Sequence, residues 1–231
     1  MDQALCIAAT AYCAARMALV AKALAALGTR VTWVWTGEAD DRAEAVHLGL
    51  PADTADGLPE CDLENALVVI AHANDFTLAF AETAASAGAP ILAVDAGARA
   101  FVDDRAAREL DRRASFHLCA TAHQRDNLRR DGISVQRALV IGCGLAATAQ
   151  RLAGSARSDT VALWLLGEHD RQALRAAAEA VAEEVSLAVV HCSSLRELSG
   201  ARAVVTDSDA AAVFACALGI PCVTVAWHTS R

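Results

Sequence analysis

The stretch GAPILAVDAGAR, residues 88–99, decides the fold. Gly88 and Pro90 end a preceding helical pattern, and the apolar run Ile91–Val94 follows as a short strand. Asp95 stands directly after that strand. Because the strand is apolar throughout, with no polar residue in alternate positions, it indicates a parallel sheet covered by helices on both faces.

Short apolar runs alternate with longer helical patterns in both directions from this stretch. A small, polar segment, residues 154–159, separates two such series and is typical of a linker. We therefore predict an α/β fold with two Rossmann-like lobes and parallel sheets, residues 1–153 and a reduced second lobe, residues 160–231. The expected strands are residues 4–9, 30–36, 67–71, 91–94, 116–119 and 139–141 in the first series, and 161–166, 187–190, 203–206 and 222–225 in the second.

The composition narrows the function classes. Hydrophobic residues make up 55% of the 231 residues, so the chain can bury a core. A net charge of −8 argues against a nucleic-acid or anionic-membrane surface, since both need clustered Lys and Arg. None of the eight cysteines forms a CxxC pair, so we expect reduced thiols and no metal site. With neither a basic start nor an apolar run of ~18 residues, we expect a cytoplasmic protein.

Ligands of such folds lie beyond the carboxyl ends of the strands. These positions are residues 10–13, 71–75, 95–99, 142–144, 167–169 and 206–209. The sequence contains neither GxGxxG nor GxxxxGK[ST], so nothing in it requires NAD or a P-loop nucleotide, and we expect no cofactor.

Several strand ends, taken in order, resemble the non-hydrolysing UDP-N-acetylglucosamine 2-epimerase family. The run from Gly88 to Arg99 is similar to the family's GIPV…EAGLR segment. Arg16–Leu24 resembles its first helix, and Val31–Gly37 resembles its second strand. The other similar stretches are Asp103-Asp104, His117–Thr121 with Asn127-Leu128, Val140–Gly142, Gly167–Arg171, Val205–Ser208 and Leu218–Pro221.

The resemblance implies a glycosyltransferase-B-like architecture in which the second lobe holds most of UDP. It also implies a reaction in which a base removes the C2 proton of a UDP-sugar while UDP leaves C1, and UDP then adds back after C2 is protonated on its other face. Two faces require two acid/base groups, and the diphosphate needs cationic help. By resemblance the catalytic residues are Asp95, Asp103, Asp104 and His169. The substrate-binding residues are Thr10, Arg16, Arg99, Gly142, Arg171, Asp207 and Ser208.

The residues themselves leave other interpretations open. Asp95 can simply satisfy a turn, Asp103 and Asp104 can favour the dipole of the helix that they open, and His169 can be a surface residue. The chain also departs from the family. Alanine and cysteine replace the arginine and glutamate of GTRPE, and Asp209 replaces a glycine of DSGG, where phosphate is expected.

Two functions follow. The first is a UDP-sugar 2-epimerase with altered specificity. The alternative is a non-catalytic paralogue that acts as a partner or regulatory subunit. The reduced second lobe leads us to expect an apolar face that needs a partner, and hence a homo- or hetero-oligomer.

Overall fold

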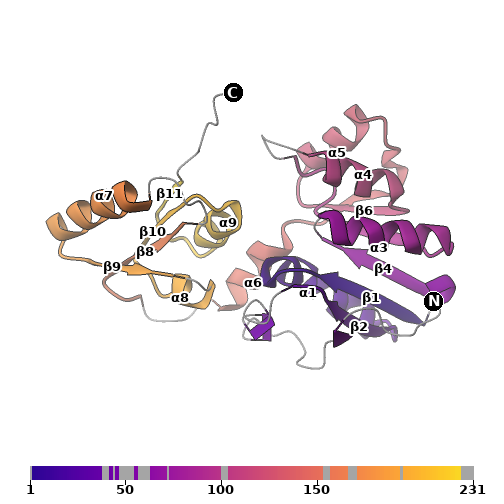
Figure 1. Ribbon diagram of the computed structural model, residues 1–231, viewed down its shortest axis with the longest axis horizontal. Coiled ribbons are helices and arrows are strands. Elements are labelled where there is room, and N and C mark those ends of the chain that lie inside the picture. Colours follow the sequence, from indigo (N-terminus) through magenta and orange to yellow (C-terminus); the bar gives the residue numbers. More distant parts are fainter. Residues whose placement is uncertain are drawn as a thin grey trace. The chain divides into compact units, whose positions relative to one another are not determined.

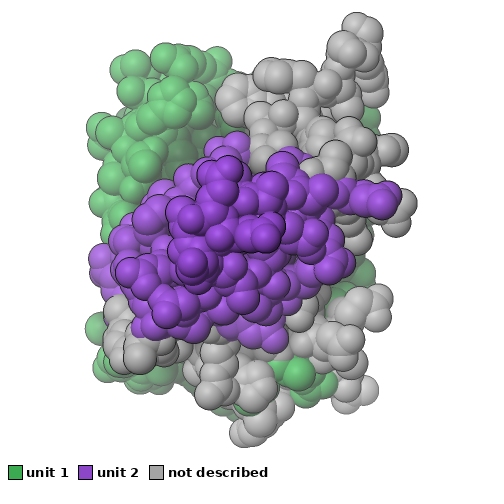
Figure 2. Space-filling model, turned by 90° about the vertical axis from the view of Figure 1, so that its left-hand side faces the viewer, with its two compact units in different colours: residues 1–144 green, residues 145–231 purple. Residues whose placement is uncertain are grey.

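The computed structural model describes residues 2–37, 42–43, 45–46, 55–56, 63–71, 73–99, 104–152, 157–165, 171–192 and 195–224. The chain divides into two compact units, unit 1 (residues 1–144) and unit 2 (residues 145–231), which Figure 2 shows in green and purple. The sequence over residues 38–48 also predicts a helix that ends before Pro51, and most of these residues fall outside the described ranges.

Unit 1 is built on a parallel sheet with the strand order β3-β2-β1-β4-β5-β6-β7 (Figure 1). All six expected strands are present, each within one residue of the predicted ends, so the parallel α/β fold is confirmed. The two-residue β3 is too short to leave a pattern in the sequence. The strands are β1 (Gln3–Ala8), β2 (Arg30–Trp35), β3 (Ala55–Asp56), β4 (Ala66–Ile70), β5 (Ile91–Val94), β6 (Phe116–Cys119) and β7 (Ala138–Val140).

Helices cover both faces of this sheet. The helices are α1 (Ala11–Ala26), α3 (Asp75–Ser86), α4 (Arg105–Arg113) and α5 (Ala122–Arg130), with short 3₁₀ turns at Leu63–Asn65 and Val135–Arg137. From β1 the chain moves to β2 on one side, whereas from β4 it moves to β5 on the other. Right-handed crossovers therefore place α1 on one face and α3, α4 and α5 on the opposite face.

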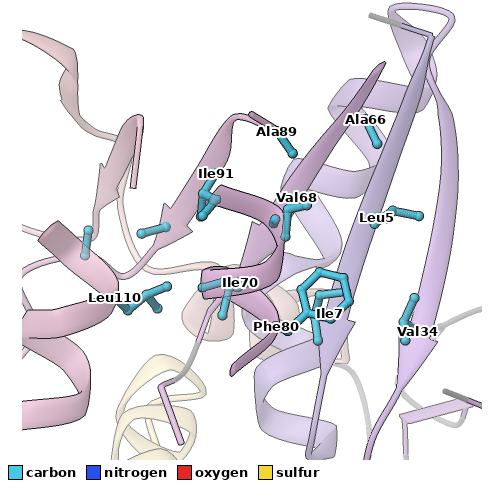
Figure 3. Close-up of a cluster of buried hydrophobic side chains, with 14 of the residues drawn as sticks. Leu5, Ile7, Val34, Ala66, Val68, Ile70, Phe80, Ala89, Ile91 and Leu110 are labelled. Atoms are coloured by element: carbon cyan, nitrogen blue, oxygen red, sulfur yellow. The ribbon is translucent and has the colours of Figure 1, made fainter. Parts of the chain in front are cut away.

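The core of unit 1 forms where α3 and α4 pack on the central strands. Figure 3 labels Phe80 of α3 and Leu110 of α4, which belong to one buried cluster with Ile7, Ile70 and Ile91 of the strands. Every residue of β4 and of β5 is buried. Burial on both faces explains why these strands are apolar throughout.

Unit 2 contains a smaller parallel sheet, with the order β11-β10-β8-β9 (Figure 1). The strands are β8 (Thr160–Trp164), β9 (Ala188–His191), β10 (Ala203–Thr206) and β11 (Cys222–Thr224). The helices are α7 (Arg171–Glu184), α8 (Leu195–Ser199) and α9 (Asp209–Ala217). The expectation of a smaller second sheet is confirmed.

One helix was missed by the sequence analysis. Helix α6 (Gly144–Leu152) follows β7 directly, where no element was expected. Its buried residues Leu145, Thr148 and Ala149 recur at helical spacing, and that periodicity is the signal that could have revealed it.

Within the described ranges, no helix is long and apolar enough to cross a membrane. The described cysteines, Cys6, Cys13, Cys119, Cys143, Cys192, Cys216 and Cys222, are all free thiols. In the same part of the chain, no group of His, Cys, Asp and Glu side chains is placed to hold a metal ion.

Candidate functional site

The strand order of unit 1 has its switch point between β1 and β4, because the chain moves away from these neighbours in opposite directions. Ligands of open α/β sheets bind beyond the carboxyl ends of the strands at such a point. Thr10 and Arg16 belong to the segment that follows β1, and Asp95 follows β5, the neighbour of β4. The fold therefore gathers three of the sequence-predicted site residues at one edge of the sheet.

Arg16 and Asp95 form an ion pair at this edge. The distance from Arg16 Nη1 to Asp95 Oδ2 is 3.1 Å, and the side chains are 25% and 7% exposed. Burial raises the pKa of Asp95 above its ordinary value, and the nearby Arg16 guanidinium opposes that rise without cancelling it. Asp95 also has a positive φ of 56°, which is uncommon for a residue other than glycine. Positions of this kind cluster at functional sites.

A small cavity opens beside this pair. It has a volume of about 70 Å³, and its lining includes Arg16, Ala71, Asp95 and Leu110. A space of this size with charged walls suits a few water molecules or a small polar group. The carboxyl group of Asp95 thus borders a small, partly open space with polar walls.

The loop after Asp95 is held rigidly from two sides. The Gly97 N–H donates to Asp111 Oδ2 at 3.1 Å, and Asn127 Nδ2 donates to the Gly97 carbonyl at 3.0 Å. Gly97 has a φ of +75°, and a Cβ atom there would lie 2.0 Å from the Gln124 carbonyl oxygen. Only glycine fits this approach to α5, so the position of Asp95 depends on Gly97.

Arg99 is enclosed by carboxylates rather than pointing at open space. Its guanidinium makes four hydrogen bonds, two to Asp131 Oδ2 at 2.9 and 2.6 Å, one to Asp111 Oδ2 at 2.9 Å and one to the Ala98 carbonyl at 2.7 Å. Its side chain is only 12% exposed. The substrate-binding role expected for Arg99 stays a prediction, because most of its donors are used within the chain.

Asp104 is connected to the network around Arg99 indirectly, through Arg108. Its carboxylate pairs with Arg108 at 3.2 Å, and Arg108 also approaches Asp131 at 3.3 Å. Asp104 occupies the N-cap position of α4 but makes no side-chain capping hydrogen bond. Asp103, the other acidic residue expected here, lies outside the described residues.

Sequence reasoning missed Asp111, the residue that connects the loop at Gly97 to the Arg99 side chain. It is 3% exposed, and burial raises the pKa of its carboxyl, while Arg99 and the Gly97 N–H oppose the rise. Its backbone carbonyl accepts a hydrogen bond from His117 Nε2 at 2.8 Å. In the sequence, Asp111 stands in the charged run RELDRR, where only the preceding Leu110 hints at burial.

The N-terminus of α1 is capped by the side chain of Thr10. Thr10 Oγ1 accepts a hydrogen bond from the Cys13 N–H at 3.2 Å and lies 3.1 Å from Cys13 Sγ. Thr10 is therefore the N-cap residue of a helix that begins at the switch point. Gly142, at the end of the last strand, has a φ of +89° with open space around its Cα.

Unit 2 has a comparable edge, with its switch point between β8 and β10. Ser208 follows β10 there, caps α9 by accepting from the Ala211 N–H at 3.3 Å, and is 5% exposed. Asp207 precedes it and is partly buried. A helix N-terminus at this place favours an anion. Arg171 begins α7, and His169 lies outside the described residues.

Two Rossmann-like units with separate parallel sheets define the glycosyltransferase-B-like class of folds. The sequence matches no known family model and no curated protein. Several solved structures do match the fold of this chain. The Methanocaldococcus jannaschii UDP-GlcNAc 2-epimerase, in complex with UDP-GlcNAc and UDP, gives a TM-score of 0.78 at 16% identity, over 97% of this chain and 83% of that chain. S. aureus MnaA with UDP gives 0.77 at 14%, over 98% and 80%.

The fold of this chain is thus that of the UDP-GlcNAc 2-epimerases. The lipopolysaccharide outer core galactosyltransferase WaaB also matches, with a TM-score of 0.52 at 12% identity, over 97% of this chain and 80% of that chain. The same architecture also serves a transferase, so the fold alone does not determine the chemistry.

Proposed function

We propose that this chain is a divergent member of the UDP-GlcNAc 2-epimerase family that binds a UDP-sugar and exchanges the proton at C2 of the sugar. The fold supports this proposal, and so does the order of the similar stretches along the sequence. The single observation that carries it is Asp95, a buried carboxylate beside a polar cavity at the switch point of unit 1.

The proposed reaction needs a group that takes a proton from carbon and later returns one. In the first step the C2–H bond and the C1–O bond to UDP break, and a C1=C2 double bond forms. In the second step C2 is protonated on its other face and UDP adds back to C1. Because burial raises the pKa of Asp95, its carboxylate is a stronger base than an exposed aspartate. Asp103, Asp104 and His169 are the proposed partners in proton transfer and in departure of the diphosphate.

The Arg16 guanidinium stabilises the charged form of the Asp95 carboxyl group and so opposes the effect of burial. Its side chain is one-quarter exposed, so donors remain that can meet an oxygen of the substrate. In our proposal Arg16 orients Asp95 and contacts the substrate. In the same proposal Arg99 positions Asp95 indirectly, because its hydrogen bonds to Asp111 and Asp131 fix the loop that carries Asp95.

Unit 2 supplies the anion contacts in this proposal. The N-terminus of α9, capped by Ser208, favours the diphosphate, and Asp207 and Arg171 of the same unit are further proposed contacts. Thr10 and Gly142 stay proposed substrate contacts of unit 1. Asp209, the first residue of α9, places a negative charge at that end of the helix. At ~4 Å and an effective dielectric of about 20, two like charges repel by about 4 kcal/mol, so we expect weak UDP binding.

A second candidate function is a non-catalytic subunit that retains the fold. The observation that favours it is the Arg16–Asp95 pair itself, because a buried carboxylate held by a guanidinium at 3.1 Å is a weaker base than one buried without such a partner. An aspartate also reaches ~1.3 Å less far than the glutamate of the family, and misplacement on that scale can reduce a rate about 100-fold.

Calorimetric titration with UDP and with UDP-GlcNAc tests the binding that the proposed function requires. We expect a dissociation constant below about 1 mM for at least one of them. Arg16→Met should weaken binding of the sugar nucleotide, whereas Arg129→Met, which changes an exposed arginine on α5, should leave it unchanged. Absence of binding at millimolar ligand would contradict the proposal.

A further inference from the structure

Asp111 is a second buried carboxyl group at the cavity beside Asp95. The lining of that cavity, whose volume is about 70 Å³, includes both aspartates together with Arg16. Asp95 and Asp111 are 8% and 3% exposed, and they come from different elements, the turn after β5 and the last turn of α4. Ionisable groups buried at a cleft cluster at functional sites, so Asp111 is a candidate for a part in the chemistry of Asp95.

Each of the two carboxyl groups uses one oxygen atom for an arginine and leaves the other available. Oδ2 of Asp95 pairs with Arg16 at 3.1 Å. Oδ2 of Asp111 accepts hydrogen bonds from the Gly97 N–H at 3.1 Å and from Arg99 at 2.9 Å. No described residue donates to Oδ1 of either aspartate, and neither Oδ1 atom is fully enclosed by protein. The two Oδ1 atoms are therefore the carboxylate oxygens that water in the cavity can reach.

Water fits this cavity in size and in polarity. A volume of about 70 Å³ has room for several water molecules. A buried water molecule needs about two to four polar partners, and the carboxyl groups of Asp95 and Asp111 and the guanidinium of Arg16 supply them. Water in this place is in contact with both aspartates through their free oxygen atoms, so a proton can pass from one carboxyl group to the other.

We propose that Asp111 is a proton-relay residue, linked to Asp95 through water in the cavity that the two aspartates share. This inference rests on the proposed function. After Asp95 has taken the proton from C2 of the sugar, a water molecule accepts that proton from Asp95 and donates one of its own to Asp111. Asp95 is then ionised again, Asp111 is neutral, and the number of protons is unchanged. The reverse sequence returns a proton to Asp95.

The surroundings of Asp111 suit a group that holds a proton for a short time. Burial raises the pKa of its carboxyl, while Arg99, the Gly97 N–H and the nearby His117 oppose the rise. The pKa of Asp95 is raised in the same way, by burial against the attraction of Arg16. Because the pKa values of both carboxyl groups are shifted in the same direction, proton transfer between them is close to balanced and can run both ways.

The pH dependence of deuterium exchange at C2 of UDP-GlcNAc tests the relay. If both carboxylates must be ionised to receive the proton, the logarithm of the wild-type rate should rise at low pH with a limiting slope of about two. Asp111→Asn keeps an oxygen that can accept from Gly97 and Arg99 but cannot take up a proton. In this variant the slope should fall to about one and the rate should fall roughly tenfold or more, with KM unchanged.

Asp131→Asn is the matched comparison. Asp131 is the other carboxylate partner of Arg99, but it is not among the described residues that line the cavity. This variant should slow exchange only through the position of the loop and should keep the limiting slope of about two. A wild-type slope in Asp111→Asn, or the same loss of slope in Asp131→Asn, would overturn the relay alone. Absence of exchange by the wild-type chain would overturn the proposed function together with the relay.

A high-resolution crystal structure of the wild-type chain tests the relay without any variant, and it decides the matter if circular dichroism shows that Asp111→Asn does not fold. We expect ordered water that joins Oδ1 of Asp95 to Oδ1 of Asp111, directly or through a second water molecule. A cavity without ordered water, or water that contacts only one of the two aspartates, would overturn the relay.

Discussion

Arg16 and Asp95 form an ion pair across β4 at the switch point of unit 1, with 3.1 Å between Nη1 and Oδ2. Arg16 is placed by the helix after β1, and Asp95 is placed by the turn after β5, so the two residues meet only because the sheet order brings these strands to the two sides of β4. Burial of Asp95 and the opposing attraction of Arg16 together determine how readily Asp95 accepts and returns a proton.

Asp95 should make the folded protein less stable as the pH rises. Its pKa is raised from 3.8, because burial outweighs the attraction of Arg16, so the folded state binds this proton more tightly than the unfolded state. Stability from this source is complete below the unfolded pKa and is lost as pH rises through the folded pKa. Urea unfolding from about pH 3.5 to 6.5 should therefore show wild type losing stability relative to Asp95→Asn. A gain in stability of the wild type relative to Asp95→Asn over this pH range would mean that the attraction of Arg16 outweighs burial and holds the pKa of Asp95 below its ordinary value.

Gly97→Ala should destabilise the protein far more than Gly88→Ala. Both glycines have nearly the same positive φ, +75° and +76°, but a Cβ at Gly97 would lie 2.0 Å from the Gln124 carbonyl oxygen, and one at Gly88 would meet nothing within 4 Å. We expect a loss of about 1 kcal/mol in the free energy of unfolding at Gly88 and about 3 kcal/mol or more at Gly97. Equal losses in urea unfolding would contradict the close approach to α5.

Asp111→Ala should be among the most disruptive single changes in α4. It removes an acceptor from Arg99 and from the Gly97 N–H in a nearly buried place, and we expect a loss of about 3–5 kcal/mol. Asp126→Ala is the matched control, because its pair with Arg129 is 46% and 70% exposed and should contribute less than about 1 kcal/mol. Similar losses in the two variants would show that the Arg99 network does not hold the loop.

Removal of the charge at Asp209 should strengthen UDP binding. Asp209→Asn and Asp209→Gly should both raise the affinity at least about tenfold in calorimetry, because the repulsion of the diphosphate disappears. Both should lower the stability of unit 2 by about 0.3–1 kcal/mol, since an acidic residue at the start of α9 favours the helix dipole. If neither variant binds UDP more tightly, the charge-repulsion explanation is wrong.

Much of the fold could be predicted because its buried strands are short apolar runs between helical patterns. The run Ile91–Val94 is entirely buried, as expected for a strand covered on both faces. Helix α6 was missed because its polar and small residues resemble the linker that follows, and only the spacing of Leu145, Thr148 and Ala149 indicates a helix.

The candidate site could be predicted only in part. Arg16, Thr10 and Asp95 stand at strand ends in the sequence, and the structure brings them to one edge. The enclosure of Arg99 could not be predicted, because its partners Asp111 and Asp131 lie 12 and 32 residues away along the chain. Both appear in charged helical stretches whose sequence suggests solvent, so their burial emerges only from the packing of α4 and α5 on the loop.

Incubation of UDP-GlcNAc with the protein in heavy water, followed by proton NMR of the sugar, tests the proposed chemistry most directly. We predict that deuterium enters C2 and that Asp95→Asn abolishes the exchange while UDP still binds, because the variant keeps the shape of the side chain but cannot take up the proton. Arg129→Met should exchange like wild type. UDP-sugar binding by the wild-type chain without any deuterium at C2 would contradict a catalytic role for Asp95 and leave the non-catalytic subunit as the function of this fold.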